Sequence, residues 1–344
     1  MRAIRIDKTG IGKIIELAIP QPEPGQLLVR VGAVGVCLSD VELWEGSRPP
    51  AYLQYPVTPG HEWSGTVTEI GSGVAGFAVH DRVAVEGHNF CSTCFYCKRG
   101  ETNLCSHYSE LGFTLPGAYA EYVTVRADLA HKFSAELAFE MAALTEPASC
   151  VANGILRANL GKDDTLVVVG PGTIGLLAVA WARHLGVAQV LAVGLDNANQ
   201  ELAYKMGATH YAAGTTAAKT LVASLTDNRG ADLAVEAAGT AAALNTAFDL
   251  VRRGGTLVTI GITGGRQPLE LPADMLCLKD LRLHGIFAYN SAHFQQSLRA
   301  IESQSLKVSA LITHRLPLSD YETAFRLLRT KSEPVGKIIL DPRQ

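Results

Sequence analysis

The sequence predicts two folding units, a mostly antiparallel, barrel-like β domain and an α/β domain with a doubly wound parallel sheet. Short Val-rich runs bounded by Gly, Pro and Asp fill residues 1 to about 145. After Pro147, apolar strands alternate with helical patterns of about 10–15 residues, which is the order of βαβ units. The length of 344 residues also suits about two domains.

The first unit is expected to consist of short β-strands. No long helical pattern separates the runs, so neighbouring strands are expected to pair in antiparallel fashion. The expected strands are LLVRVGAVGV (27–36), GTVTEIG (65–71), DRVAVEG (81–87) and AYAEYVTV (118–125).

The second unit is expected to begin with the strand TLVVVG (165–170) and a helix over 173–186. Its strands are apolar throughout, as expected when helices cover both faces of a parallel sheet. Further strands are expected at 190–194, 232–239, 256–261 and 281–286, with helices at 199–208 and 241–255. The remaining chain predicts a helix over 293–304, a second helix after 320 and the strand GKIILD (336–341). This tail either closes the parallel sheet or returns to the first unit.

The run GPGTIG at 170–175 is the clearest cofactor signal, because it follows an expected strand and opens an expected helix. The first glycine makes the turn, the second lets a pyrophosphate approach the backbone, and the third packs helix on strand. The free N–H groups of the helix start favour an anion. A tight βα turn without a ligand is the alternative. The expected cofactor-binding residues are Gly170, Gly172, Thr173, Ile174 and Gly175.

An acidic residue that holds the adenosine ribose is expected about 20 residues after such a turn. Asp196 lies two residues beyond the strand that ends at Gly194. No Arg occurs between Gly194 and Tyr204 that could bind the 2′-phosphate of NADP. The sequence therefore favours NAD over NADP, and NADP stays an alternative. The alternative role for Asp196 is the N-cap of the following helix.

Four of the seven cysteines fall within 15 residues. Clustered thiols in a reducing compartment are more often metal ligands than disulfides, and four thiolates close a tetrahedral structural zinc site. A zinc ribbon that binds nucleic acid and an iron–sulfur cluster are the alternatives. The expected zinc ligands are Cys91, Cys94, Cys97 and Cys105, within a lobe of about 88–108.

Composition and charge pattern argue against three classes of protein: nucleic-acid-binding, exported and membrane-spanning proteins. A net charge of −3 gives no basic surface for nucleic acid. The N-terminus alternates charged and apolar residues without a signal-peptide core, so a cytoplasmic protein is expected. The longest uncharged stretch, Thr165–Ala182, contains three glycines and a proline and is not expected to span a membrane.

Three further segments contain candidate metal ligands, and they indicate a metal site only when they are taken together. Cys37 in GVCLSD, His61 and Glu62 in GHEWSG, and Glu146 in TEPASC each have an ordinary explanation as core, surface or helix-start residues. Together they supply a thiolate, an imidazole and carboxylates, which are ligands of catalytic zinc.

These motifs, the four-cysteine lobe and GPGTIG, in this order along the whole chain, resemble the zinc-dependent medium-chain dehydrogenases, most closely the sorbitol and threonine dehydrogenase branch. The resemblance implies a GroES-like β-barrel catalytic domain (1–148 and 290–344) and a Rossmann NAD-binding domain (149–289). It also implies two zinc ions per subunit. The catalytic zinc ligands that it implies are Cys37, His61 and Glu146, with Glu62 binding zinc when water leaves or moves.

The resemblance also implies the proton path. Ser39 matches the hydroxyl that takes the alcohol proton, and Asp40 is expected to support the site by hydrogen bonding. Each has an ordinary alternative, a strand-end hydroxyl and a turn residue respectively. Glu42 stands where many relatives have a relay histidine, and Gly194 stands where many NAD-using relatives have the ribose-binding acid.

By family position alone, three aromatic residues are candidates to line the substrate cleft: Trp44, Phe113 and Tyr289. The alternative for each is ordinary core or surface packing. Relatives are commonly dimers or tetramers, and the strand LRLHGIFAY (281–289) is expected to pair across a two-fold axis.

The sequence therefore predicts a zinc-dependent, NAD-preferring alcohol dehydrogenase that oxidises a secondary hydroxyl of a sugar alcohol (polyol) or related small alcohol to the ketone, reversibly. An L-threonine 3-dehydrogenase or a simple secondary-alcohol dehydrogenase is the first alternative. A reductase without catalytic zinc and a non-catalytic, zinc-stabilised binding protein are the others. The expected partners are a small-molecule substrate and further copies of the chain, without nucleic acid or membrane.

Overall fold

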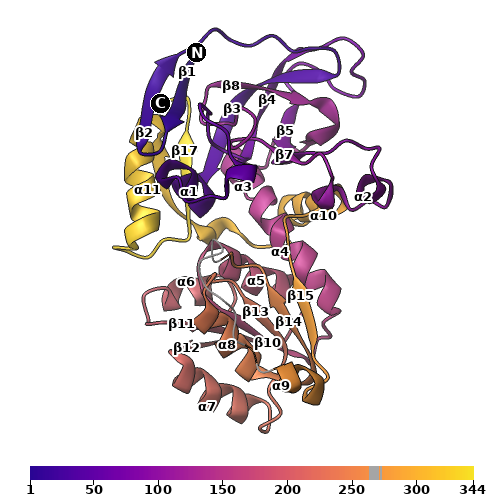
Figure 1. The fold of residues 1–344 in the computed structure, drawn as a ribbon, viewed down its shortest axis with the longest axis vertical. Coiled ribbons are helices and arrows are strands. Elements are labelled where there is room, and N and C mark those ends of the chain that lie inside the picture. Colours follow the sequence, from indigo (N-terminus) through magenta and orange to yellow (C-terminus); the bar gives the residue numbers. More distant parts are fainter. Residues whose placement is uncertain (263–270, 272) are drawn as a thin grey trace.

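The computed structural model describes residues 1–262, 271 and 273–344. These residues form two units stacked along the long axis, with helices α4 (Thr145–Ala158) and α10 (Ser291–Glu302) between them (Figure 1). Both ends of the chain lie in the same unit, the upper one in the view of Figure 1.

The first unit is built on a sheet of seven strands. Its central strand β3 (Gln26–Val36) pairs with three neighbours, and all but one of its residues are fully or partly buried. Every pairing is antiparallel except the one between β16 and β17. The other strands are β4 (Glu62–Ile70), β5 (Arg82–Val85), β8 (Tyr122–Arg126), β9 (Ala130–Lys132), β16 (Ile312–Pro317) and β17 (Lys337–Asp341).

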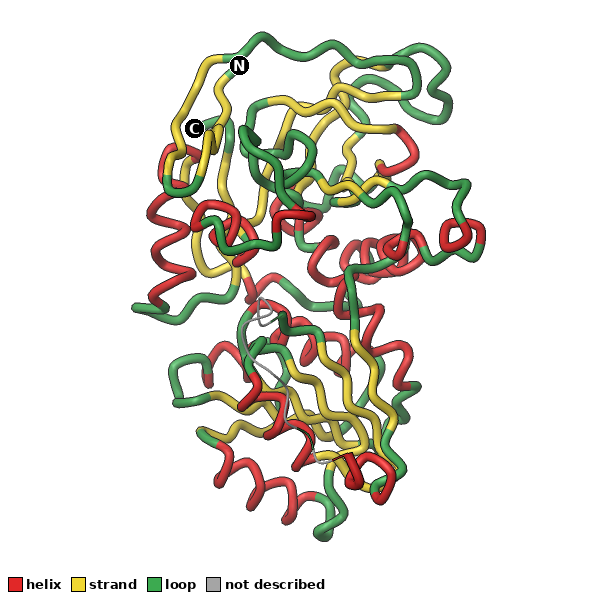
Figure 2. Tube along the Cα trace, viewed as in Figure 1, coloured by secondary structure: helices red, strands yellow, loops and turns green. Residues whose placement is uncertain are grey.

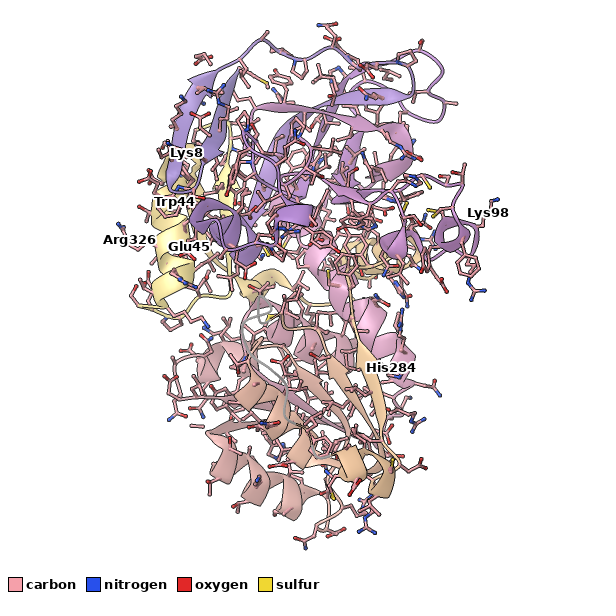
Figure 3. The ribbon with its side chains drawn as sticks, in the orientation of Figure 1. Lys8, Trp44, Glu45, Lys98, His284 and Arg326 are labelled. Carbon is pink, nitrogen blue, oxygen red and sulfur yellow. The ribbon has the colours of Figure 1, made fainter. Side chains whose placement is uncertain are left out.

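Shorter elements surround this sheet. The hairpin of β1 (Arg2–Lys8) and β2 (Ile11–Glu16) lies beside the N-terminus. Helix α1 (Leu38–Glu45) leaves the end of β3, and α3 (Phe139–Ala143) packs against β3 and β4. A projecting lobe contains β6 (His88–Asn89), α2 (Phe95–Lys98) and β7 (Ser109–Glu110), with Lys98 at its tip (Figure 3).

The C-terminal segment returns to the first unit. Strand β17 extends the sheet by pairing with β3 at Ile338 and Val36. Helix α11 (Tyr321–Thr330) buries Tyr321 and Phe325 in the same core. We propose 1–148 with 290–344 as one domain and 149–289 as the other; the boundary at residue 148 lies inside α4.

The second unit is a parallel sheet of six strands in the order β12-β11-β10-β13-β14-β15. This order, with the first strand β10 in the middle, is the doubly wound Rossmann order and confirms the predicted fold class. The strands are β10 (Thr165–Val169), β11 (Gln189–Gly194), β12 (His210–Ala213), β13 (Ala231–Glu236), β14 (Val251–Thr259) and β15 (Arg282–Gly285).

Helices flank this sheet, as the tube in Figure 2 shows. They are α5 (Thr173–His184), α6 (Gln200–Lys205), α7 (Thr215–Leu225), α8 (Ala241–Leu250) and α9 (Ala273–Leu278). The sequence analysis missed β12, α7 and α9. It also extended α8 too far, to residue 255. The helix ends at Leu250, and Gly254 has a positive φ of 65° inside the following strand.

No helix in the described part of the chain is long and apolar enough to cross a membrane. The uncharged stretch Thr165–Ala182 instead forms strand β10, a glycine turn and most of α5.

Candidate active site

The antiparallel pairing of β3 with β4 brings the first metal-ligand candidates together. Gly35 of β3 lies opposite Glu62 of β4, so Cys37, which follows β3, comes beside His61, which precedes β4. One ligand atom each of Cys37, His61 and Glu62 lies within 4.8 Å of the others. We call these three residues the metal group. A thiolate, an imidazole and a carboxylate at this separation fit a zinc ion with a position open for a substrate oxygen.

The structure places Glu146 near the metal group but outside it. Glu146 lies in the first turn of α4, and its side chain is buried. Burial raises the pKa of Glu146 to about 8, and the charges of His61 and Glu62 also act on this carboxyl. Among the described residues, the structure groups Glu62 with Cys37 and His61, and the role of Glu146 as a zinc ligand stays a prediction.

The Asp40 carboxylate contacts two members of the metal group, Cys37 and His61. Its Oδ2 accepts hydrogen bonds from the Cys37 backbone N–H (2.9 Å) and the Tyr119 hydroxyl (3.1 Å). Its Oδ1 lies 3.6 Å from Nδ1 of His61. Burial alone would lower the pKa of His61, but the Asp40 carboxylate raises it well above its usual value. A carboxylate behind a ligating imidazole orients the ring toward a metal.

Glu62 is paired with a lysine that the sequence analysis missed. Nζ of Lys337, at the start of β17, donates to Oε2 of Glu62 (2.5 Å) and to the Val36 carbonyl (3.1 Å). The two side chains are only 2–3% exposed. Burial alone would lower the pKa of Lys337, but the Glu62 charge raises it. The signal in the sequence is a lysine that opens the apolar run GKIILD.

Helix α1 carries the predicted proton path. Oγ of Ser39 lies 3.6 Å from Sγ of Cys37. Glu42 lies one turn further along α1 and is half-buried. Their roles in proton transfer stay predictions.

One of the three aromatic candidates lies against the metal group. The Phe113 ring centroid is 5.0 Å from that of His61. Trp44 instead packs against Phe325 of α11, at 6.2 Å between ring centroids. Tyr289 is fully buried, and its hydroxyl accepts a hydrogen bond from the Gly87 backbone N–H.

The four-cysteine lobe has the geometry of a second metal site. The sulfur atoms of Cys91, Cys94, Cys97 and Cys105 all lie within 4.8 Å of one another, and two of the pairs are 4.0 Å apart. Zn–S bonds of about 2.3 Å in a tetrahedron place sulfur atoms about 3.8 Å apart.

The surroundings of Cys91 and Cys94 favour the thiolate form that binds zinc, whereas burial and the neighbouring thiols raise the pKa of Cys97 to about 12. Cys91 Sγ accepts from the Thr93 hydroxyl and the Cys94 backbone N–H, and these bonds lower the pKa of Cys91 to about 5. The cluster stays consistent with a closed structural zinc site.

The glycine turn at 170–175 has the geometry expected of a pyrophosphate site. Gly170 adopts a positive φ of 98° directly after β10. A Cβ on Gly172 would meet open space, whereas a Cβ on Gly175 would lie 2.0 Å from the Gly170 carbonyl oxygen. The turn opens α5, and its Thr173 hydroxyl donates to the Gly336 carbonyl, directly before Lys337. Ile174 is partly buried in the same helix.

Asp196 lies exposed after β11, at the same end of the sheet. Its Oδ1 accepts from the Ala198 backbone N–H (2.9 Å), which forms a local turn. It is not the helix N-cap that the sequence suggested, because α6 begins later with Asn199 as N-cap. A Cβ at Gly194 would lie 2.0 Å from the Tyr211 hydroxyl and 2.9 Å from the Asp196 carbonyl oxygen, so the acid that many relatives carry here would require Tyr211 to move.

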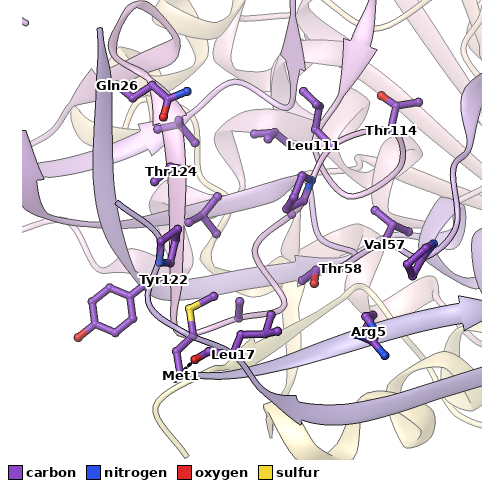
Figure 4. Close-up of a pocket in the computed structure, with 18 of the residues that line it drawn as sticks. Met1, Arg5, Leu17, Gln26, Val57, Thr58, Leu111, Thr114, Tyr122 and Thr124 are labelled. Carbon is purple, nitrogen blue, oxygen red and sulfur yellow. Dashed lines mark hydrogen bonds between the residues drawn. The ribbon is translucent and has the colours of Figure 1, made fainter. Parts of the chain in front are cut away.

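A cavity of about 770 Å³ lies elsewhere in the first unit, between β8, the N-terminus and the segment 111–117 (Figure 4). None of the predicted zinc ligands is among the described residues that line it. It is therefore distinct from the metal group.

Comparison with known proteins agrees with both units. The alcohol dehydrogenase GroES-like domain model matches residues 23–135, and the zinc-binding dehydrogenase model matches residues 173–303. The chain is 34% identical to sorbitol dehydrogenase of Halalkalibacterium halodurans, over 99% of each chain. It is 34% identical to erythritol/L-threitol dehydrogenase of Mycolicibacterium smegmatis (96% of this chain, 94% of the relative) and 30% identical to L-threonine 3-dehydrogenase of Shewanella frigidimarina (94% of each).

The solved structures that match over 99% of each chain include the following two. One is a zinc-binding dehydrogenase from Sinorhizobium meliloti 1021 bound to NADP, with a TM-score of 0.90 and 28% identity. The other is 2R,3R-butanediol dehydrogenase from Bacillus subtilis, with a TM-score of 0.89 and 28% identity. With a thiolate–imidazole–carboxylate group, a four-cysteine lobe and a glycine turn in one chain, this protein belongs to the zinc-dependent medium-chain dehydrogenase family, whose members are oxidoreductases that use a nicotinamide cofactor.

Proposed function

We propose that this enzyme oxidises a secondary hydroxyl of a polyol to the ketone, reversibly, with NAD as the preferred hydride acceptor. The observation that carries the proposal is the contact of the dipeptide 336–337 with both sites. Gly336 accepts the hydrogen bond of Thr173 in the glycine turn, and Lys337 binds Glu62 of the metal group. Two consecutive residues, Gly336 directly before β17 and Lys337 at its start, therefore connect the glycine turn of the cofactor site to the metal group.

Zinc bound here acts as a Lewis acid that lowers the pKa of the substrate hydroxyl. The side chains around the zinc site transfer the proton and position the metal ligands. In this proposal Ser39, whose Oγ lies 3.6 Å from Sγ of Cys37, accepts the hydroxyl proton, and Glu42 of the same helix passes it outward. Asp40 orients His61, and Lys337 neutralises Glu62.

The polyol substrate class is supported by the sorbitol and erythritol/L-threitol dehydrogenases among the relatives. A threonine dehydrogenase of 30% identity supports the second candidate. Glu42 weighs against that candidate, because the resemblance to threonine dehydrogenases implies a histidine at this position.

The proposed function predicts chelator-sensitive formation of reduced nicotinamide with at least one polyol. The measurement is absorbance at the nicotinamide band with sorbitol, xylitol, galactitol, L-threonine and 2-propanol, each with NAD and with NADP. Turnover of threonine alone or of 2-propanol alone would overturn the polyol class. No turnover of any alcohol by zinc-loaded protein would favour a binding protein that lacks catalysis.

Asp196→Ala is expected to raise KM for NAD about tenfold, with much less effect on KM for NADP. The Asp196 carboxylate follows β11 and accepts a hydrogen bond from the Ala198 backbone N–H, and in this proposal it also accepts from the adenosine ribose. A charged hydrogen bond is worth about 1.5–3 kcal/mol. Steady-state kinetics with both cofactors measure the effect. Asn197→Ala, one residue away, is the control, and equal loss with both variants would reject this role for Asp196.

The protein is expected to be a dimer, or a tetramer built from that dimer, through the open edge of the parallel sheet. Strand β15 ends the sheet, and its residues Arg282, Leu283 and Gly285 are exposed. His284 of this strand lies at the outer side of the unit (Figure 3). Leu283→Lys is expected to shift the protein toward monomers in size-exclusion chromatography with light scattering. A monomeric wild type would remove this proposal.

We also propose a cytoplasmic location. All seven cysteines are free in the structure, and a thiolate zinc lobe is best maintained in a reducing compartment.

A further inference from the structure

An ion pair of the first unit lies next to the metal group and has no role in the proposed chemistry so far. Nη2 of Arg48, in the loop after α1, is 2.5 Å from Oε2 of Glu110 in β7. The two side chains remain 14% and 15% exposed, so each keeps a small solvent-accessible surface.

One aromatic ring separates this ion pair from the metal group. The guanidinium carbon of Arg48 lies 3.6 Å from the centroid of the Phe113 ring. The other neighbour of that ring is His61, at 5.0 Å between centroids. Burial raises the pKa of Glu110, and the positive charges of Arg48 and His61 act against this shift. The charge of His61 therefore acts on Glu110, although the Phe113 ring lies between Arg48 and His61.

Arg48 is fixed yet keeps hydrogen-bonding capacity. Its Nε donates to the Tyr52 carbonyl (3.0 Å), its Nη2 donates to Glu110, and its face packs on Phe113. Among residues 1–262, 271 and 273–344, no hydrogen bond reaches Nη1, which carries two N–H donors. A guanidinium held by three contacts loses little further freedom when a ligand binds the remaining donors.

We propose that Arg48 and Glu110 form the subsite that binds the hydroxyl groups of the substrate beyond the reacting carbon. This inference rests on the proposed function, which it deepens. A hydroxyl oxygen accepts from Nη1 of Arg48 while its proton is donated to the Glu110 carboxylate, and the two charges stay paired. A neutral polyhydroxylated chain satisfies both partners.

Other substrate classes fit this ion pair less well. A simple alcohol has no second hydroxyl, so it leaves Nη1 of Arg48 without an acceptor while Arg48 and Glu110 stay paired with each other. A phosphorylated alcohol brings negative charge against Glu110. A zwitterionic amino acid must separate Arg48 from Glu110 to pair with each. The ion pair therefore selects neutral polyols, because a site built to hydrogen-bond a hydroxyl discriminates strongly against a substrate that lacks it.

The test is the ratio of kcat/KM for sorbitol to kcat/KM for 2-propanol in the wild type, Glu110→Gln and the double variant Arg48→Met/Glu110→Gln. The ratio is expected to fall at least about tenfold in both variants, the loss of one charged hydrogen bond. The double variant removes both charges, so it leaves no buried charge unpaired and is expected to fold. Zinc content and NADH binding verify folding. Glu201→Gln, which breaks an exposed pair with Lys205, is the matched control and is expected to keep the wild-type ratio.

An unchanged ratio in the folded double variant would overturn the subsite, and so would an equal loss with both alcohols. A selective loss of L-threonine turnover in the variants would assign the ion pair to a zwitterionic substrate and would also overturn it. The proposed function is tested separately by the wild type. If the wild type oxidises 2-propanol and no polyol, the polyol function fails whatever the variants do.

Discussion

Cys37→Ser is expected to lower kcat by more than about 100-fold while NADH binding is retained. Loss of a partner that only supports a metal ligand already costs about 10–100-fold, so the loss of a ligand costs more. A serine hydroxyl at this position does not ionise as a thiol does and is a poor zinc ligand. The glycine turn lies in the other unit and does not depend on Cys37.

The measurement combines kcat with the preferred alcohol, NADH titration by fluorescence, and zinc content. Zinc is expected to fall from two ions to one per chain, because the four-cysteine lobe is intact. Cys277→Ser is the matched control, since this thiol is exposed and distant from both cysteine sites in sequence. Full turnover by the Cys37 variant would exclude the metal group from catalysis.

Lys337→Met is expected to lower the stability of the first unit by about 3–5 kcal/mol. The substitution preserves the bulk of the side chain but leaves the Glu62 carboxylate, which is only 3% exposed, without its partner. Removing one member of a buried ion pair costs this much in the zinc-free protein, where no other cation compensates the remaining charge. The double variant Lys337→Met/Glu62→Gln is expected to recover most of the loss, because no isolated charge is left.

Urea midpoints followed by a probe in the first unit measure this effect. Lys132→Met is the control, because Lys132 pairs with Asp81 at the surface (3.5 Å), where ion pairs contribute about 0–1 kcal/mol. If both lysine variants lose the same stability, Lys337 has no special role. If the double variant is no more stable than the single variant, the loss comes from packing rather than from charge.

The sequence predicted well those features that lie within one short segment of the chain. The glycine turn and the four-cysteine lobe each lie in a short segment, and spacing alone indicates their chemistry. The apolar strands β10, β11 and β13 were equally clear, because both of their faces are buried. Strand β12 was missed because it is a short edge strand with partly exposed residues, which gives a weak hydrophobic pattern.

What the sequence could not predict depends on distant pairing. Glu62 and Lys337 are 275 positions apart, and Arg48 and Glu110 are 62 positions apart. Only the strand order brings each pair together. Family resemblance named Glu146 as a zinc ligand, and that role stays a prediction; the pairing of β3 with β4 places Glu62 with Cys37 and His61. A motif indicates which residues take part, whereas backbone register decides which atoms meet.

The return of β17 to the first unit sets an order of events during synthesis. The parallel-sheet unit is continuous in sequence and can fold as soon as its last strand has left the ribosome, since domains generally fold as units and from the N-terminal side. The sheet around β3 must wait for Lys337–Asp341, some 300 positions later. Until that strand docks, Glu62 has no cation beside it. The metal group is therefore completed last, on a nucleotide-binding unit that is already folded.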